Sequence, residues 1–357
     1  MNQLPVVAIT MGDASGIGPE IIVKAMARPE IGTWARALVV GDAERLREAI
    51  NITGAAVQVR AVESPEDARY QPGHIDCLDV PVVPAGHPFG VVSPVSGDGA
   101  FQFVKKAVEL VLAGKAQAIC TAPLNKEALH LGGHNFPGHT EMLQALAAEH
   151  AGVSVSDMPV RMMLANPDLR TVLNSIHVSL RQAIEAVTAS QVEETLRITH
   201  DFLARTVARQ AHRPPNIAVA GLNPHAGEGG LFGTEEQEAI IPAVARAQAL
   251  GMHVHGPYPP DTVFMQAHAA AHAPIPFCDV VIAMYHDQGL IPVKYLGVEQ
   301  GVNVTLGLPL VRTSPDHGTA FDLAGTARAD AQSLLAALDM ARMLSASDFS
   351  PAHGAGS

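Results

Sequence analysis

Short runs of apolar, mostly β-branched residues alternate along this chain with stretches whose apolar positions recur every three or four residues. The first run, VVAIT at residues 6–10, is followed by a glycine-rich turn and by PEIIVKAMA. Pro19 falls in the first turn of that predicted helix, where a missing N–H costs nothing. Further strands are predicted at residues 37–42 and in AQAICTAP, which Pro123 ends. This alternation is typical of an α/β fold with a mostly parallel sheet.

Two longer helices are predicted with defined ends. The first, AFQFVKKAVELVLAG, places its apolar side chains on one face and stops at Gly114. The second opens with Thr234 and Gln237 at the spacing of a capping box and closes at Gly251. Residues 266–277 are rich in Ala, His and Pro and are expected to form a surface excursion, and residues 345–357 to form a frayed tail.

Three strand-like runs each lead into a histidine. RTVLNSIH ends at His177, NIAVAGLNPH at His225 and DVVIAMYH at His286. Ligands of open parallel sheets bind beyond the carboxyl ends of the strands, so these histidines are expected on one rim. Three neutral imidazoles suit zinc, cobalt, nickel or manganese and leave positions open for substrate. One such histidine alone more often caps backbone or lies at the surface; the coincidence of three favours a catalytic metal site.

Other polar residues occur in loops. FPGHTEML offers His139 and Thr140 before a helix, where free N–H groups favour an anion such as phosphate. A simple helix cap at Thr140 is the plainer interpretation. Lys294, Asn303 and Arg312 fall in a glycine-rich stretch with many strand formers, and each alone is more often a surface residue.

Two further glycine-containing motifs indicate places where another group can approach the backbone closely. GDASGIGPE is not a GxGxxG fingerprint, because its glycines fall at 12, 16 and 18, and it indicates only backbone access at the start of a helix. HGTAFDLAG, at residues 317–325, is more specific, since no packing reason accounts for its order of small residues and Asp322.

Composition limits the class of protein. A chain of 357 residues favours two domains or lobes, and 48% hydrophobic with 16% charged residues fits a packed enzyme. The net charge of -12 argues against nucleic-acid binding, so an anionic substrate needs a local positive site. Three cysteines without a CxxC pair argue against disulfides or a thiolate metal site and favour the cytoplasm. No secretion signal or membrane span is predicted.

The motifs, in their order, resemble the 4-hydroxythreonine-4-phosphate dehydrogenase family, including its D-threonate and D-erythronate 4-phosphate dehydrogenase branch. The family is related to isocitrate and isopropylmalate dehydrogenases. The resemblance covers residues from about 5 to about 342 and rests on MGDASGIGPE, TAPLNKEAL, PGHTE, GLNPHAGEGGLFGTEE, PPDTVF, YHDQG, GVNVTLGLP and RTSPDHGTAFDLAG. It implies two α/β/α lobes around a central cleft. Residues 1–125 plus 300–357 would form the cofactor-side lobe, and residues 126–299 the lobe for substrate, metal and dimerisation.

The resemblance also implies roles for individual residues. The three histidines match ligands of one divalent ion (Zn, Mg, Co or Mn) in a site shared by two subunits of a homodimer, with His286 supplied by the partner chain. The residues that match the holders of the phosphorylated substrate are His139, Thr140, Lys294, Asn303 and Arg312. HGTAFDLAG is similar to the adenosine-binding loop of isopropylmalate dehydrogenase, which implies NAD or NADP contacts at Gly12, His317, Gly318, Thr319, Ala320 and Asp322. A carboxylate near the ribose favours NAD, because it repels a 2'-phosphate.

Two features depart from the family pattern and concern loop geometry. DAS at residues 13–15 stands where the family commonly has Asp-Pro-Ala, and the Ala- and His-rich stretch before Cys278 is longer than usual.

The implied reaction oxidises the secondary alcohol of a 4-phosphorylated 3-hydroxy acid and then releases CO2 from the β-keto acid. One candidate substrate is 4-phosphohydroxy-L-threonine, giving 3-amino-2-oxopropyl phosphate in pyridoxal phosphate biosynthesis. The other is D-threonate or D-erythronate 4-phosphate, giving dihydroxyacetone phosphate in sugar-acid catabolism. Lys294, Asp261 and Asp287 are candidate catalytic groups, although the two aspartates could equally orient a ligating histidine.

Two alternatives come from other classes. A metal-dependent isomerase or aldolase would use the same histidines without NAD, and a silent metal-binding protein would show no turnover. Asp322 distinguishes a dehydrogenase from the isomerase or aldolase, because removal of its carboxylate should weaken NAD binding only in a dehydrogenase.

Overall fold

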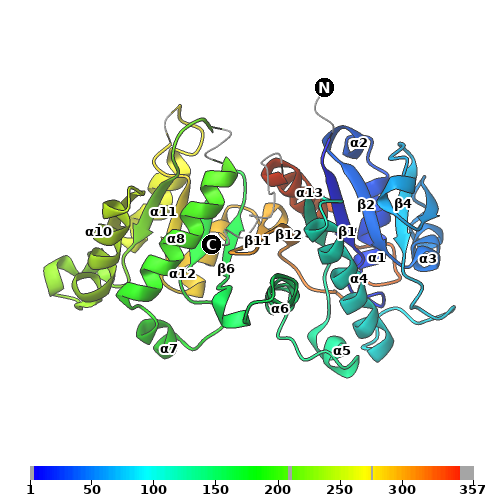
Figure 1. Cartoon of the computed structure of the whole chain (residues 1–357), viewed down its shortest axis with the longest axis horizontal. Coiled ribbons are helices and arrows are strands. Elements are labelled where there is room, and N and C mark those ends of the chain that lie inside the picture. Colours follow the sequence, from blue (N-terminus) through cyan, green and yellow to red (C-terminus); the bar gives the residue numbers. More distant parts are fainter. Residues whose placement is uncertain (1–3, 208–210, 275, 346–357) are drawn as a thin grey trace. The chain divides into compact units, whose positions relative to one another are not determined.

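The computed structural model describes residues 4–207, 211–274 and 276–345. It divides the chain into unit 1, within residues 1–159 and 308–357, and unit 2, residues 160–307 (Figure 1). Each unit is a sheet with helices, so the predicted α/β class is confirmed. The bounds differ from those implied by the resemblance, because α6 (His139–Ala151) packs against α4 (Pro94–Leu112) and β11 (Val302–Leu306) pairs with β6 (Arg161–Ala165). The expected tail at residues 346–357 lies outside the described residues.

Unit 1 contains strands in the order β3-β4-β2-β1-β5-β12, and all of their pairings are parallel. The strands are β1 (Val6–Thr10), β2 (Arg36–Gly41), β3 (Gln58–Val62), β4 (His74–Asp79), β5 (Ala118–Thr121) and β12 (Val311–Pro315). The helices besides α4 and α6 are α1 (Gly18–Met26), α2 (Ile31–Trp34), α3 (Ala43–Thr53), α5 (Lys126–Leu131) and α13 (Gln332–Ser345), with short η1 (Pro65–Asp67) and η2 (Val155–Asp157). Since a parallel sheet has all its carboxyl ends at one edge, the loops after β1, β5 and β12 lie together.

Local sequence explains most of unit 1. All five residues of β1 are buried, as expected for a strand covered on both faces. Helix α4 begins earlier than predicted, at Pro94, where the side chain of Ser93 accepts the N–H of Val95. Its end is close to the predicted one, with Gly114 at φ +73° just beyond Leu112.

Unit 2 contains strands in the order β11-β6-β7-β10-β8-β9. Strands β7 (Arg170–Leu173), β10 (Val280–Ala283), β8 (Asn216–Ala220) and β9 (His253–Tyr258) are parallel, whereas β6 is antiparallel to both β7 and β11. The helical segments are α7 (Leu180–Glu185), α8 (Ala189–Arg205), η3 (Pro224–Gly230), η4 (Glu236–Ile240), α10 (Ile241–Ala249), α11 (Pro260–Ala269), α12 (His286–Tyr295) and η5 (Val298–Gln300). The apolar runs before the three histidines are therefore strands, as predicted.

Two local predictions in unit 2 were wrong in detail. The expected capping box at Thr234 is not formed: the helix opens as the π-helical segment η4, without a side-chain cap. Pro242 explains the wider turn, because it has no N–H for an ordinary helical bond to residue 238. The expected surface excursion at 266–277 begins only after Ala269, where α11 ends with Ala267 buried.

No helix in the described part of the chain is both long and apolar enough to cross a bilayer. The three cysteines are buried free thiols. Burial raises the pKa of Cys120 and of Cys278 to about 12, so these thiols stay protonated and weakly reactive at neutral pH.

Candidate active site

The three strands that lead to histidines are neighbours in unit 2. Strand β10 pairs in parallel with β7 on one side and with β8 on the other, so their carboxyl ends share one edge. His177 follows β7, His225 lies in η3 after β8, and His286 is the first residue of α12 after β10. This is the shared edge that the sequence predicts.

His177 and His286 lie side by side within one chain. Their ring centroids are 5.6 Å apart at an interplanar angle of 44°. Asp287 holds the second ring, with its Oδ1 2.8 Å from Nδ1 of His286. A bond to Nδ1 leaves Nε2 as the ligating atom, which is the usual way in which a carboxylate orients a metal-binding histidine. The resemblance implied that His286 comes from the partner chain, whereas the structure places it beside His177 of the same chain.

His225 is not part of a three-residue cluster in one chain. Among the residues that the structure describes, no group of three His, Cys, Asp or Glu side chains could hold a metal ion. The backbone of His225 is left-handed, with φ 53°, and the four residues that follow are left-handed too. Its ring lies 6.2 Å, centroid to centroid, from that of Phe232. One chain therefore brings two imidazoles together and presents the third in a separate, unusual turn.

Glu236 fixes the loop that carries His225, and the sequence analysis did not predict this role for Glu236. The residue is only 1% exposed. The carboxylate accepts the N–H groups of Leu222 and Asn223, both at 2.8 Å, and the side-chain amide of Asn223 at 3.0 Å. A Cβ at Gly227 would lie 2.7 Å from its Oε2, which explains that glycine. The acidic pair in GTEE was the only signal in the sequence.

Arg312 is a buried cation in unit 1. It lies on β12, is 5% exposed, and donates from Nε (3.2 Å) and Nη2 (2.8 Å) to Oγ1 of Thr121 on the adjacent β5. Burial lowers the pKa of Arg312 to about 10. The guanidinium is therefore still charged at neutral pH, and a buried positive charge of this kind can bind an anion.

The start of α6 lies near Arg312 and offers donors to the same anion. Gly138 is the N-cap and makes no side-chain cap, and Thr140 lies inside the first turn, so it is not the capping residue. The first-turn N–H groups of such a helix favour negative charge. Nε2 of His139 is buried and has no hydrogen-bond partner among the described residues. Burial and the charge of Arg312 lower the pKa of His139 well below its usual value, so the ring is neutral.

The other predicted substrate and catalytic residues belong to unit 2. Lys294 lies in the last turn of α12 rather than in a strand, and Asn303 lies on β11. Asp261 is exposed in the first turn of α11. The structure does not bring these residues together with Arg312 in one unit, and their roles stay predictions.

The two glycine-containing motifs meet at the carboxyl edge of unit 1. The N–H of Ile17, in the loop after β1, donates to the carbonyl of Thr319, in the loop after β12, at 3.0 Å. A Cβ at Gly16 would lie 3.0 Å from Cβ of Thr319, so glycine lets the two loops pack without a tight contact. Asp322 is exposed beside the loop, and Ala320 has a left-handed φ of 41°. Nδ1 of His317 lies 3.0 Å from the carbonyl oxygen of Gly318.

Gly12 has a structural explanation. A Cβ there would lie 2.2 Å from the carbonyl oxygen of Pro123, and its φ is +69°. Glycine is therefore needed to pack the ends of β1 and β5 together, and a cofactor contact is not required to account for it.

A buried polar network around Asp13 follows Gly12, and the sequence analysis did not predict it. Oδ1 of Asp13 accepts the N–H of Ser15 at 2.8 Å, while Oδ2 is buried without a partner among the described residues. Burial raises the pKa of Asp13 to about 6. Oγ of Ser15 lies 2.8 Å from Oγ of Ser96 and 3.1 Å from Nε2 of His87. Ser15 belongs to the DAS departure from the family pattern, so this network depends on that substitution.

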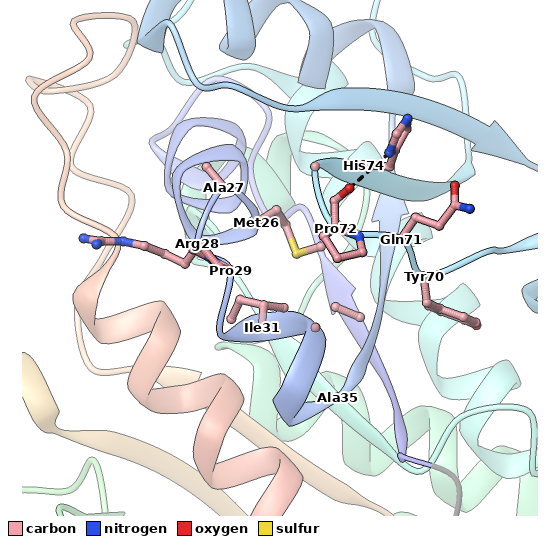
Figure 2. A pocket seen from close by; sticks show the side chains of 13 residues that line it. Met26, Ala27, Arg28, Pro29, Ile31, Ala35, Tyr70, Gln71, Pro72 and His74 are labelled. Atoms are coloured by element: carbon pink, nitrogen blue, oxygen red, sulfur yellow. Dashed lines mark hydrogen bonds between the residues drawn. The ribbon is translucent and has the colours of Figure 1, made fainter.

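A hollow in unit 1 lies away from these groups. Figure 2 shows its lining, which includes Met26, Ile31, Tyr70 and Pro72. The lining also includes residues beside the amino ends of β2 and β4, such as His74. Because ligands of parallel sheets bind beyond the carboxyl ends, this hollow is not part of the candidate site.

Two α/β units with mostly parallel strands, and with two loops packed together at the carboxyl edge of unit 1, are typical of α/β enzymes that bind ligands beyond the strand ends. The sequence profile of the family described as "Pyridoxal phosphate biosynthetic protein PdxA" matches residues 33–341. The chain belongs to this family.

Named relatives agree with this assignment. The D-threonate 4-phosphate dehydrogenase of Cupriavidus necator is 50% identical over 338 residues, 94% of this chain and 96% of that protein. The 4-hydroxythreonine-4-phosphate dehydrogenase of Beijerinckia indica is 48% identical over 338 residues, 94% of either protein. A crystal structure of a 4-hydroxythreonine-4-phosphate dehydrogenase from Burkholderia phymatum matches with a TM-score of 0.84 and 48% identity, covering 96% of this chain and 99% of that chain. The resemblance seen in the sequence is confirmed, and the protein is an oxidoreductase of this type.

Membership in a dehydrogenase family implies a nicotinamide cofactor, NAD or NADP, and a divalent metal ion. The residues present fit both groups. The paired imidazoles of His177 and His286 are nitrogen donors whose ring centroids are close enough for both to reach one ion. The loop around Thr319 presents the exposed Gly318 and the exposed carboxylate of Asp322 at the edge where such sheets bind nucleotides.

Proposed function

We propose that this protein uses NAD and one divalent metal ion to oxidise and decarboxylate a 4-phosphorylated 3-hydroxy acid. The observation that carries the proposal is the anion site of unit 1, where a buried arginine, a neutral histidine and an uncapped helix start converge. Such a site is built for a phosphate group, and the named relatives are dehydrogenases of phosphorylated hydroxy acids.

The phosphate is bound by three kinds of donor. Arg312 supplies the charge, His139 donates from its unpartnered Nε2, and the first turn of α6, including Thr140, supplies backbone N–H groups. A neutral His139 protonated on Nε2 donates without adding a second buried charge. Lys294 and Asn303 retain the substrate-binding role that the family resemblance implies.

The metal ion is held by His177 and His286, with Asp287 fixing the second ring. When bound, such an ion supplies Lewis-acid chemistry at the hydroxyl and carboxylate of the substrate. Asp261, Asp287 and Lys294 are the candidates for moving the hydroxyl proton. Asp287 already contacts His286, so orientation of that ring is its better supported role.

NAD is bound by the loop from His317 to Asp322. This loop contacts the loop after β1 through the hydrogen bond from Ile17 to Thr319, and Asp322 is exposed. A carboxylate at that position accepts from ribose hydroxyls and repels a 2'-phosphate, which favours NAD over NADP. This pair of loops makes unit 1 the cofactor side.

The active site is completed by a second copy of the chain, forming a homodimer. We place His225 as the ligand that the second copy contributes, because His177 and His286 already lie together in one chain. Large exposed apolar side chains follow His225 and line nearby segments of unit 2: Leu231 is 72% exposed and Met265, on α11 in contact with η3, is 67% exposed. Burial of such residues is the usual driving force for a subunit interface.

Two substrates are proposed. The first is 4-phosphohydroxy-L-threonine, which would place the protein in pyridoxal phosphate biosynthesis. The description of the family names that pathway. The second is D-threonate 4-phosphate or its D-erythronate isomer, and the relative at 50% identity, itself a D-threonate 4-phosphate dehydrogenase, favours it. The protein is expected to act in the cytoplasm, where its free buried thiols persist.

The deciding experiment measures NAD reduction by the purified, metal-loaded protein. The three phosphorylated acids are offered in parallel, each with and without EDTA, and NADP replaces NAD in a matched series. Chelator-sensitive turnover of the amino acid phosphate supports the biosynthetic role, and turnover of the sugar-acid phosphates supports the catabolic one. No reduction of either cofactor with any of the three contradicts the proposal and leaves the isomerase or aldolase alternative to be tested.

A further inference from the structure

A second polar hollow lies in unit 2, at the sheet edge opposite the histidines. It is lined by residues at the amino ends of β7 and β10, including Arg170, Asp279 and Val280, and by Arg213 just before β8. His272, from the Ala- and His-rich stretch after α11, also lines it. The candidate active site uses none of these residues.

One carboxylate in the hollow is already fully used. Nη1 and Nη2 of Arg213 donate to Oδ2 and Oδ1 of Asp279 at 2.7 and 2.6 Å. Oδ2 also accepts the backbone N–H of Asn216 at 2.8 Å. The Asp279 side chain is only 4% exposed, so the pair is a fixed part of the sheet edge. Arg213 and Asp279 cancel each other's charge.

The positive charge of Arg170 is poorly compensated by its surroundings. The one hydrogen bond that it makes among the described residues runs from Nη1 to the backbone carbonyl of Asp279 at 3.5 Å, which is the limit of a hydrogen bond. Removal from water lowers the pKa of Arg170, and Asp279 is the nearest opposing charge. Asp168, the other carboxylate of the hollow, contacts His272. Arg170 and Arg213 therefore share the carboxylate of Asp279, and a partly buried cation with so little compensation is costly.

The longer Ala- and His-rich stretch reaches the same hollow. Nε2 of His272 lies 2.7 Å from Oδ1 of Asp168, which also lines the hollow. The imidazole is 76% exposed, so the hollow is reached from solvent. The loop that departs from the family pattern therefore adds a titratable donor beside Arg170 and Arg213.

We propose that this hollow is a second anion site, separate from the substrate site, for the phosphate or carboxylate group of a small metabolite. Arg170 is the principal ligand, because its planar guanidinium has free donors that match two oxygens of an oxyanion. Arg213 keeps the carboxylate of Asp279 occupied, and His272 lies at the entrance of the hollow, where it contacts Asp168.

The test is equilibrium dialysis of the full-length protein with radiolabelled inorganic phosphate, with acetate as a competing carboxylate in a second series. Four proteins are compared: the wild type, Arg170→Gln, Arg312→Gln, which removes the main cation of the substrate site, and the double variant. Arg181→Gln, on exposed α7, is the matched control for loss of a surface arginine. Circular dichroism establishes that each variant is folded, and Arg170→Lys retains the charge without the planar fork.

The expected result is two phosphates per chain for the wild type and one for either single variant, with Arg181→Gln unchanged. Arg170→Lys should bind the second phosphate about tenfold more weakly, because a bidentate contact is lost. Displacement of only that second phosphate by acetate shows that the site accepts carboxylates as well. Unchanged phosphate binding in Arg170→Gln overturns the proposal, as does complete loss of binding in Arg312→Gln. Loss in Arg170→Gln with none in Arg312→Gln instead contradicts the proposed phosphate subsite in unit 1.

Discussion

The rings of His177 and His286 lie 5.6 Å apart, centroid to centroid, although they follow different strands of unit 2. The strands β7 and β10 are hydrogen-bonded neighbours with Val281 opposite Thr171, and this register sets the two histidines beside each other. The pair supplies two of the three ligands of the proposed metal site, and no rearrangement of the strands is needed to bring them together.

Loss of either paired histidine should remove the metal. His177→Ala and His286→Ala are expected to lower metal affinity and turnover by more than about 100-fold, since even residues that only orient a ligand contribute 10- to 100-fold. Metal analysis after gel filtration and the NAD assay measure the two effects, with His150→Ala as an exposed control on α6. Full metal content in both variants would remove the pair from the site.

Mixing inactive variants should show how the site is shared. If His225 comes from the second copy, unfolding and refolding His177→Ala together with His225→Ala restores one intact site per mixed dimer. Random pairing then gives about a quarter of the wild-type activity. A mixture of His177→Ala with His286→Ala should stay inactive. Recovery in the second mixture alone would show that His286 is the exchanged ligand.

Arg312→Gln should weaken substrate binding more than it slows chemistry. Loss of a buried charge-assisted contact is expected to raise KM by about 10- to 100-fold, while Arg312→Lys retains part of the binding. Because the pKa of Arg312 is about 10, wild-type KM should also rise as the pH passes through that value and the guanidinium loses its proton. A KM that is the same in Arg312→Gln as in the wild type rules out the proposed phosphate contact.

Asp322 should set cofactor choice. Asp322→Asn removes the repulsion of a 2'-phosphate, so its ratio of kcat/KM for NAD over NADP is expected to fall about tenfold. Steady-state kinetics with both cofactors measure this ratio, and Asp330→Asn is a control carboxylate in the same exposed region. An unchanged ratio would place the ribose elsewhere.

Asp13 should make stability depend on pH. Its pKa is raised to about 6 in the folded protein, so the native state keeps a proton that the unfolded chain releases above pH 3.8. Stability contributed by this group is therefore full below pH 3.8 and is lost as pH rises to 6, by about 3 kcal/mol. The stability of Asp13→Asn relative to the wild type should increase by that amount between pH 4 and 7.

Urea unfolding across that pH range measures the difference, and Asp201→Asn, an exposed carboxylate on α8, is the control. A pH-independent difference for Asp13→Asn would mean that the carboxyl is ionised in the native protein.

Several parts of the fold followed from the chain alone. VVAIT gave β1 because a run buried on both faces must be apolar throughout, and Pro19 and Gly114 marked helix ends through their own backbone chemistry. The family was recognised from ordered motifs, and the family profile and relatives confirmed it. The capping-box rule failed at Thr234, because Pro242, eight positions later, makes the start of this helix π-helical.

The sequence by itself determined which residue types stand at strand ends and which loops contain glycine. Only the tertiary structure decided which of those residues meet. Strand order placed His177 next to His286 and left His225 in a left-handed turn held by Glu236. Burial decided that His139 is neutral and that the pKa of Asp13 is raised, and it left Arg170 with one long hydrogen bond among the described residues. These properties depend on desolvation and on contacts between residues distant in the chain, neither of which a local pattern contains.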